Sequence, residues 1–359
     1  MKQLSIIENN MKGSYAVPPV SGFDQAYEFH RTIAGYRPTP LIGLKSLAAE
    51  TGVGSILMKD ESERFGLNAF KGLGASYAAY MAAQKYSKDI RGFISCTDGN
   101  HGKALAWIAQ KMGIPCRILM PRGAESRRIR QIEKYGASVE VMEMNYDDTV
   151  RCAAAEAEKS AWTLVQDTAL PGYTEIPGYI TCGYSTMMRE VLAQADEMPT
   201  HLFIQAGVGS LAGGVIAYLE SVCGSRLPFI GIIEAAPAAC YYESAAAGKK
   251  ICIGGGPETA MAGLNCGEPN FVNYPYLMSR TDVFIKCSDA VTYKGMERAR
   301  HPAGTDRAFS SGECGAVGLG VIETVLTDPS YAAERLQLKL DSDSRILLFN
   351  TEGEIEDDE

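Results

Sequence analysis

Lys71 is the residue of this sequence whose surroundings most suggest covalent chemistry. It ends the stretch Ser62–Lys71, Ser-Glu-Arg-Phe-Gly-Leu-Asn-Ala-Phe-Lys, and an apolar run at helical spacing follows it from Gly72 to Tyr86. The amine is therefore predicted at a helix N-terminus, where the helix dipole disfavours a positive charge. Two interpretations follow. The lysine either extends to solvent, or its pKa is lowered by desolvation and a positive neighbourhood, so that the neutral amine can form a Schiff base.

A glycine-rich stretch, Gln205–Gly214, follows an apolar run and precedes a helical one. Backbone amides in such a loop can hold a phosphate at the helix N-terminus. The spacing of its glycines nearly matches the dinucleotide pattern G-x-G-x-x-G. Its place in the middle of the chain disfavours a dinucleotide. Glu234, in the strand that follows, could bind a ribose, but nothing in the sequence supports this role. The stretch predicts a phosphate site without identifying the phosphate.

Two carboxylates and an amide are expected at the ends of strands. Cys96–Gly102, Cys-Thr-Asp-Gly-Asn-His-Gly, contains Asp98 and Asn100, and Val165-Gln-Asp-Thr contains Asp167. Asn100 could hydrogen-bond a ligand oxygen, and strand-end carboxylates in a cleft suit acid–base catalysis. Each of these residues could equally be a helix cap.

Strand-like and helix-like segments alternate along the chain, which predicts βαβ units, parallel sheets and an α/β fold. The predicted strands are Ser55–Asp60, Phe93–Cys96, Cys116–Met120, Ser138–Met142, Trp162–Val165, His201–Gln205, Phe229–Ile233, Val283–Ile285 and Arg345–Phe349. The predicted helices between them include Asn100–Met112, Ala124–Tyr135, Tyr146–Ser160 and Pro177–Gln194. We expect two open, twisted α/β domains with a ligand in the cleft between them.

Composition limits the possible functions. The 359 residues suggest about two domains, and a net charge of −9 argues against nucleic acid or an anionic membrane as a partner. The N-terminal residues lack the apolar core of a signal peptide, and no apolar run reaches the length of about 18 residues that a membrane span needs. A cytoplasmic location is expected. The acidic residues from Glu352 to Glu359 are predicted to form a solvated tail.

Metal binding is not expected. The 10 cysteines show no CxxC spacing and most fall in apolar segments, as buried thiols do. The 4 histidines form no HxxxH or HExxH set, so a zinc site is not predicted.

Several motifs, in the same order, resemble a known enzyme family. Asn-Ala-Phe-Lys71, the Gly-Asn-His-Gly turn and the later glycine loop resemble the fold type II, or tryptophan synthase β-like, pyridoxal phosphate enzymes. Longer matches, between about Phe29 and Gly353, are similar to the diaminopropionate ammonia-lyases. They are Lys59–Ser62 with Arg64–Lys71, Thr97–Gly102, Asn145–Thr149, Val165–Thr168, Met261–Leu264 with Cys266–Asn270, Ser311–Glu313 and Thr351–Gly353.

The resemblance implies a role for each candidate site residue. Lys71 would hold pyridoxal phosphate as a Schiff base, Asn100 would contact its ring hydroxyl, and Thr351 would lie near its pyridine nitrogen. Asp98 and Asp167 would be the acid–base carboxylates. The backbone amides that would bind the phosphate are those of Gly207, Val208, Gly209, Ser210 and Leu211.

The resemblance also implies an architecture and a reaction. Residues 1–75 and 186–359 would form a large cofactor-binding domain, and residues 76–185 a small α/β domain. The reaction would release ammonia from 2,3-diaminopropionate, in the D form, the L form or both, and give pyruvate and a second ammonia. A homodimer is expected. Cys240 and Cys266 match positions that can form a disulfide in the family, but reduced thiols are expected in a cytoplasmic chain.

Two alternatives stay open. The chain could be another fold type II lyase, such as a serine or threonine dehydratase or a β-replacement enzyme. It could instead be a non-catalytic protein that binds the cofactor or a nucleotide through the glycine loop, although the presence of Lys71, Asp98 and Asp167 speaks against this.

Overall fold

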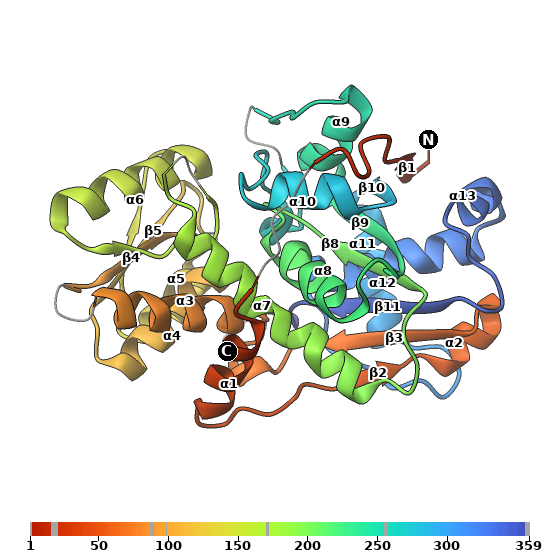
Figure 1. Cartoon of the computed structure of the whole chain (residues 1–359), viewed down its shortest axis with the longest axis horizontal. Helices are drawn as coiled ribbons and strands as arrows, with labels where there is room; N and C mark the ends of the chain where they lie inside the picture. Colours follow the sequence, from red (N-terminus) through yellow and green to blue (C-terminus); the bar gives the residue numbers. More distant parts are fainter. Residues whose placement is uncertain are drawn as a thin grey trace.

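The strands of this chain form two separate sheets, as expected for an α/β fold with two units. The structure, a computed structural model, describes residues 2–15, 21–86, 90–97, 99–169, 172–254 and 258–355, without the side chain of Asp147. Figure 1 shows the smaller sheet and its helices on the left and the larger sheet on the right, with helix α7 running between them.

The larger sheet has seven strands in the order β1-β10-β9-β8-β11-β3-β2. The strands are β1 Leu4–Glu8, β2 Leu41–Gly43, β3 Ser55–Asp60, β8 His201–Gln205, β9 Phe229–Ala235, β10 Val283–Cys287 and β11 Arg345–Asn350. The five central strands are parallel, which confirms the predicted parallel sheet, and the two edge strands β1 and β2 are antiparallel. These two edge strands were not predicted from the sequence.

The smaller sheet has four parallel strands in the order β6-β5-β4-β7. They are β4 Phe93–Cys96, β5 Cys116–Met120, β6 Ser138–Val141 and β7 Thr163–Leu164. The helices of this unit are α3 Lys71–Tyr86, α4 Asn100–Met112, α5 Ser126–Glu133 and α6 Tyr146–Ser160. The βαβ repetition predicted for this part of the chain is confirmed, with end shifts of a few residues.

The remaining helices cover the larger sheet or connect the two sheets. They are α1 Phe23–Thr32, α2 Lys45–Thr51, α7 Glu175–Gln194, α8 Ser210–Cys223, α9 Cys240–Ala247, α10 Asn273–Arg280, α11 Asp289–Arg300, α12 Glu313–Thr327 and α13 Ala332–Gln337. Short 3-10 helices lie at Arg64–Gly66, Ala236–Ala238, Ala262–Leu264 and Pro329–Tyr331. Over the described ranges, no helix is both long and apolar enough to cross a membrane.

Both faces of the larger sheet are buried, which explains why its strands are apolar without alternation. In β8, Leu202 and Ile204 belong to an apolar core that includes α7 and α8, whereas Phe203 packs in a second core with α11 and α12. The first core also contains Phe93 and Ile118 of the smaller sheet. The two sheets are therefore joined by a shared core. The predicted domain boundaries, after residues 75 and 185, fall within α3 and α7 and stay a prediction.

A buried network of charges holds the turn that leads to Lys71. The Arg64 guanidinium contacts Glu61 (Nε to Oε2, 2.8 Å) and Glu190 of α7 (Nη2 to Oε2, 2.7 Å). Lys59, at the end of β3, also contacts Glu190 at 2.7 Å. All four side chains are buried. Because two cations and two anions share one network, the charges balance without water.

The same turn contains unusual backbone conformations. Phe65 and Asn68 both have a φ of 56°, in the left-handed region that residues other than glycine rarely adopt. Hydrogen bonds to the C-terminal segment hold the turn: the Phe70 N–H donates to the Thr351 carbonyl (3.0 Å), and the Gly353 N–H donates to the Asn68 carbonyl (3.2 Å). Surrounding structure of this kind is what allows a strained turn to persist.

We expect Arg64→Met to lower the free energy of unfolding by about 3 to 5 kcal/mol, because Glu61 and Glu190 would lose the cation that they share in a buried site. Urea unfolding followed by circular dichroism measures this quantity.

Arg37→Met is the matched control, because Arg37 contacts Glu63 at the surface, with both side chains more than half exposed. A change of about 1 kcal/mol or less is expected for the control. Equal losses for the two variants would contradict the importance of the buried network.

Candidate active site

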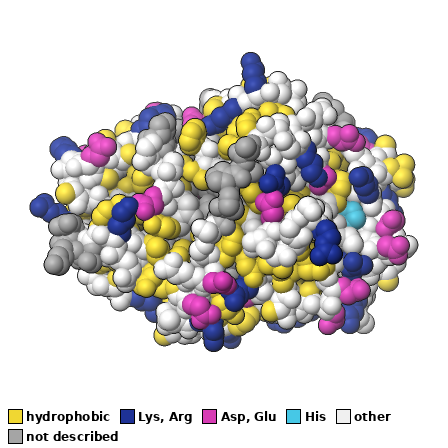
Figure 2. Space-filling model, viewed as in Figure 1, with side chains coloured by type: hydrophobic (Ala, Val, Ile, Leu, Met, Phe, Trp, Pro, Cys, Tyr) yellow, Lys and Arg dark blue, Asp and Glu magenta, His cyan; other side chains and the backbone are white. Residues whose placement is uncertain are grey.

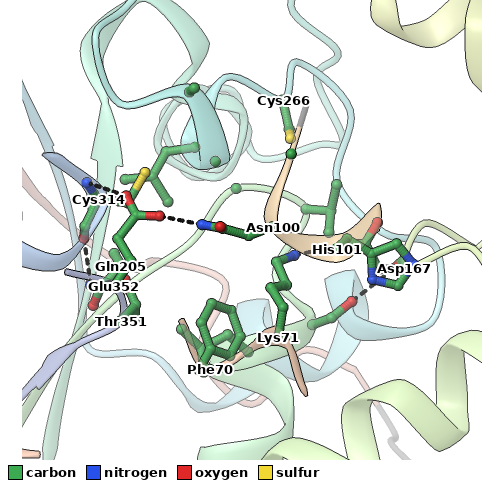
Figure 3. A pocket seen from close by; sticks show the side chains of 18 of the residues that line it. Phe70, Lys71, Asn100, His101, Asp167, Gln205, Cys266, Cys314, Thr351 and Glu352 are labelled. Atoms are coloured by element: carbon green, nitrogen blue, oxygen red, sulfur yellow. Dashed lines mark hydrogen bonds and ion pairs between the residues drawn. The ribbon is translucent and has the colours of Figure 1, made fainter. Parts of the chain in front are cut away.

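A cleft lies where the carboxyl ends of strands from both sheets meet, and it brings together residues far apart in the sequence. Its unfilled space is about 910 Å³, the solvent at its mouth included. The predicted site residues that line it are Lys71, Asn100, Asp167, Gly207, Val208, Gly209, Ser210, Leu211 and Thr351. Asp98 lies outside the described residues, but its neighbours Thr97 and Gly99 line the cleft. Figure 3 shows Lys71 near the centre of this cleft.

Lys71, the first residue of α3, forms an ion pair with Asp167, which follows β7. Lys71 Nζ lies 2.6 Å from Asp167 Oδ2. Burial alone would lower the pKa of Lys71, but attraction to the Asp167 carboxylate outweighs it and the pKa is raised. Burial would raise the pKa of Asp167, but Lys71 holds it at about 2. The prediction of a lowered pKa for Lys71 is therefore wrong for this arrangement, because an anion stands where a positive neighbourhood was expected.

His101 lies beside this pair but was not predicted as a site residue. It lines the cleft and is buried. Its Nε2 lies 2.8 Å from the Val165 carbonyl, which can only accept, so Nε2 carries the proton. Burial lowers the pKa of the imidazole. His101 is consequently neutral at pH 7 and adds no charge to the pair formed by Lys71 and Asp167.

The glycine loop forms the floor of a possible anion site at the start of α8. Gly209 precedes the helix with a φ of 96°, and the Gly213 N–H makes an early helical bond to the Gly209 carbonyl (2.9 Å). The first N–H groups of a helix have no partner within it. A Cβ on Gly207 would come within 2.8 Å of the Gly263 carbonyl oxygen, and one on Gly209 within 2.2 Å of the Tyr241 hydroxyl. Only glycine fits these two positions.

The backbone of Asp167 is tied to this loop by side chains. The Ser210 hydroxyl donates to the Asp167 carbonyl at 3.0 Å, and Asn270 Nδ2 donates to the same carbonyl at 3.0 Å. The Asn270 N–H in turn donates to the Val208 carbonyl (2.9 Å). Asn270 was not assigned a role from the sequence, although it ends one of the matched motifs. These bonds fix the backbone of Asp167, which comes from the smaller unit, against the loop from the larger unit.

The opposite end of the cleft holds residues from the C-terminal segment. Thr351 and Glu352 follow β11, and Glu352 accepts a hydrogen bond from Asn100 Nδ2 at 2.5 Å. Gln205 donates through Nε2 to the Phe349 carbonyl at 3.0 Å and lies 3.3 Å from the Thr351 hydroxyl. The prediction of a solvated tail is therefore wrong at its first residue, because Glu352 lines the cleft. Residues 356–359 lie outside the described part of the chain.

Two further expectations can be compared with the structure. Cys240 and Cys266 are not joined by a disulfide, in agreement with the expectation of reduced thiols.

Glu234, considered above for a ribose-binding role, instead accepts hydrogen bonds from the N–H groups of Tyr241 (2.8 Å) and Tyr242 (2.7 Å) at the start of α9.

Comparison with known proteins agrees with this geometry. Residues 33–326 match the family described as "Pyridoxal-phosphate dependent enzyme". The diaminopropionate ammonia-lyase of Escherichia coli K12 is 44% identical over 348 residues, which cover 92% of this chain and 87% of the relative. The enzyme of the same name from Salmonella typhimurium is 40% identical, with coverages of 92% and 88%. The chain belongs to the diaminopropionate ammonia-lyase family.

A solved structure of this family matches the whole fold. The E. coli diaminopropionate ammonia-lyase in complex with an aminoacrylate-PLP azomethine reaction intermediate has a TM-score of 0.92 and 42% identity, and the match covers 98% of this chain and 94% of that chain. The fold is thus that of the fold type II pyridoxal phosphate enzymes.

The cleft fits the cofactor that this family uses. Pyridoxal phosphate needs an amine for its aldehyde, donors for its phosphate and polar partners around its ring. The chain offers Lys71 at the centre, amides at the start of α8 without helical partners, and Asn100 and Thr351 on the side away from Asp167. Gly207 and Gly209 line the cleft with backbone alone. A diaminopropionate ammonia-lyase would hold its cofactor with such a set.

We expect Asp167→Asn to lower the pKa of Lys71 by at least about one unit, because burial would then act without the opposing carboxylate. The test uses the cofactor-free protein and a small amine-reactive reagent, with modification of Lys71 measured by peptide mass spectrometry. The pH dependence of this modification should shift to lower pH. Asp148→Asn, on the exposed side of α6, is the control. A profile that stays in place for Asp167→Asn would contradict the coupling.

Proposed function

We propose that this chain eliminates ammonia from 2,3-diaminopropionate and so yields pyruvate and two molecules of ammonia. The observation that supports this most directly is the contact between the Lys71 amine and the Asp167 carboxylate beside a glycine loop. Bound pyridoxal phosphate supplies an electron sink for the negative charge that develops at the α-carbon. A relative in the same family has been observed in complex with an aminoacrylate-PLP azomethine reaction intermediate.

In this proposal, different residues of the cleft bind different parts of the cofactor. Lys71 holds the cofactor aldehyde, and the amides from Gly207 to Leu211 bind the phosphate. Asn100 donates to the ring hydroxyl oxygen, and Thr351 lies near the ring nitrogen. The support is positional: the amine, the amides and the two polar side chains line one cleft.

Two carboxylates serve the leaving group and the proton transfers. The β-ammonium of the substrate is stabilised by an anion, which a neutral pocket for serine or threonine would not provide. The α-carbon loses a proton to a base, the bond between the β-carbon and nitrogen breaks, and the nitrogen leaves as ammonia. The 2-aminoacrylate that remains is released, and water converts it to pyruvate and the second ammonia. Asp167 and Asp98 are proposed as the acid–base groups.

The base for the α-proton differs between the two substrate isomers in this proposal. The α-proton of the D and L forms lies on opposite faces of the bound substrate. Asp98 serves the D form, and Lys71 or Asp167 serves the L form. A cytoplasmic homodimer that acts on a small amino acid completes the proposal.

We expect the purified protein to show Schiff-base absorbance and to release ammonia from diaminopropionate faster than from serine or threonine. Lys71→Ala should lose both the absorbance and the activity. Lys159→Ala is the control, because this lysine of α6 is 79% exposed and should change neither. A preference for serine or threonine would favour a dehydratase, and a parent protein without the absorbance would favour a non-catalytic binding protein.

We expect Asp98→Asn to abolish turnover of D-diaminopropionate and to spare the L form, because only one face of the substrate would lose its base. Initial rates of pyruvate formation from each pure isomer measure this. Equal losses for the two isomers would refute the assignment of Asp98 to the D form. Asp148→Asn again serves as the surface control.

A further inference from the structure

Glu352 lies at a junction of segments that border the cleft. Its Oε2 accepts a hydrogen bond from Asn100 Nδ2 at 2.5 Å, and its Oε1 accepts one from the Cys314 N–H at 3.1 Å. Figure 3 shows Asn100 between Glu352 and Lys71. The carboxylate therefore receives one donor from α4, beside the smaller sheet, and one from the first turn of α12, beside the larger sheet.

The surrounding backbone fixes Glu352 and leaves room for its side chain. Its main chain forms a bridge with Ala69, two residues before Lys71. The Gly312 N–H donates to the Glu352 carbonyl at 3.0 Å. A Cβ on Gly312 would come within 3.2 Å of Glu352 Oε1. A glycine at position 312 thus gives the carboxylate space at the start of α12.

The contact determines how the Asn100 amide is turned. The two ends of a primary amide have nearly the same shape, but one end only donates hydrogen bonds and the other only accepts. An ionised carboxylate only accepts, so the NH₂ end of Asn100 must face Glu352. This NH₂ group has two hydrogens, and the second remains available to an acceptor in the cleft. Hydrogen bonds to an ionised group are also stronger than neutral ones, which makes this orientation firm.

We propose that Glu352 is a positioning residue, which fixes the Asn100 amide so that it presents an N–H to the ring hydroxyl oxygen of bound pyridoxal phosphate. The inference rests on the proposed function, in which Asn100 contacts this oxygen. Without Glu352, the amide could turn its carbonyl oxygen toward the ring oxygen, and two acceptors would then face each other.

The charge of Glu352 also affects the pKa of Lys103, a neighbour on α4. Lys103 lies one helical turn after Asn100 and is buried. Burial lowers the pKa of Lys103 to about 8, and attraction to Glu352 opposes this decrease. The carboxylate therefore acts electrostatically on the first turn of α4, where Asn100 lies.

Titration of the cofactor-free protein with pyridoxal phosphate tests the proposal. Glu352→Ala should weaken the affinity by about ten- to hundredfold, which is typical of a lost hydrogen bond to a charged group, and should shift the absorbance band of the bound cofactor. Glu354→Gln is the matched control, because this side chain, two residues further on, contacts Arg300 at 2.8 Å instead of the cleft. The control should keep the parent affinity and spectrum.

A paired exchange separates positioning from a merely structural link. Asn100→Asp alone would place two carboxylates in contact and lower the thermal midpoint. Asn100→Asp combined with Glu352→Gln restores a hydrogen bond with the donor on the other side. The double variant should recover the midpoint but not the cofactor affinity or spectrum, because it presents no N–H at position 100.

Two outcomes are decisive. Unchanged affinity and absorbance in Glu352→Ala would overturn the proposal, and so would recovery of both in the double variant. If Glu352→Ala does not fold, Glu352→Gln serves in its place, because a glutamine can both donate and accept and so no longer forces the NH₂ end of Asn100 to face it. A parent protein that binds pyridoxal phosphate but does not act on diaminopropionate would contradict the proposed substrate and leave this inference standing.

Discussion

The buried guanidinium of Arg64 is the interaction on which the placement of Lys71 most depends. Removing charges from water is costly, and a buried ion pair compensates for this only when its hydrogen bonds are complete. Here Arg64 meets Glu61 and Glu190, and Lys59 supplies the second positive charge. Because Glu190 belongs to α7 and the other three belong to β3 or the turn after it, the network fixes the turn against the helix that runs between the two sheets. Lys71 follows this turn directly.

The candidate active site arises where segments from five parts of the chain meet. The carboxyl ends of parallel strands lie at the same edge of a sheet, and loops at that edge converge. Lys71 follows β3 and its turn, Asn100 follows β4, Asp167 follows β7 and Thr351 follows β11. The glycine loop follows β8 and completes the set. Each of these residues is positioned by the end of a strand, so the site is complete only when both sheets have formed.

Much of the fold and of the site could be predicted from the sequence, and the failures have physical causes. The central strands are mostly apolar, and three of the helices, α4, α6 and α8, begin directly after a glycine or an asparagine, so periodicity and turn residues indicate them. The edge strands β1 and β2 pair only on one side, and β2 has just 3 residues, so their sequence carries a weak signal. Glu352 was placed in a tail because an acidic run is usually solvated. Its place in the cleft depends on a hydrogen bond from Cys314 in the first turn of α12, 38 residues earlier, which local sequence does not reveal.

The protonation of Lys71 was also beyond sequence reasoning, because it depends on a carboxylate 96 positions away. The motifs predicted that both residues belong to one site. Only the distance of 2.6 Å shows that they form an ion pair. A helix N-terminus and burial both favour a neutral amine. One well-placed anion is enough to reverse the result, since an ion pair at this distance in a buried site outweighs both effects.

This coupling bears directly on the proposed reaction. With a charged Lys71 beside it, Asp167 has a pKa of about 2 and cannot act as an acid near pH 7. Burial alone would raise this pKa. Whenever the positive charge on Lys71 is lost, the opposing attraction disappears and the carboxyl group becomes able to hold a proton. His101 is neutral and does not replace the missing charge. In the proposed reaction, the charge of Lys71 would thus determine whether Asp167 stays an anion that attracts the substrate ammonium or becomes an acid that can give a proton to the departing nitrogen.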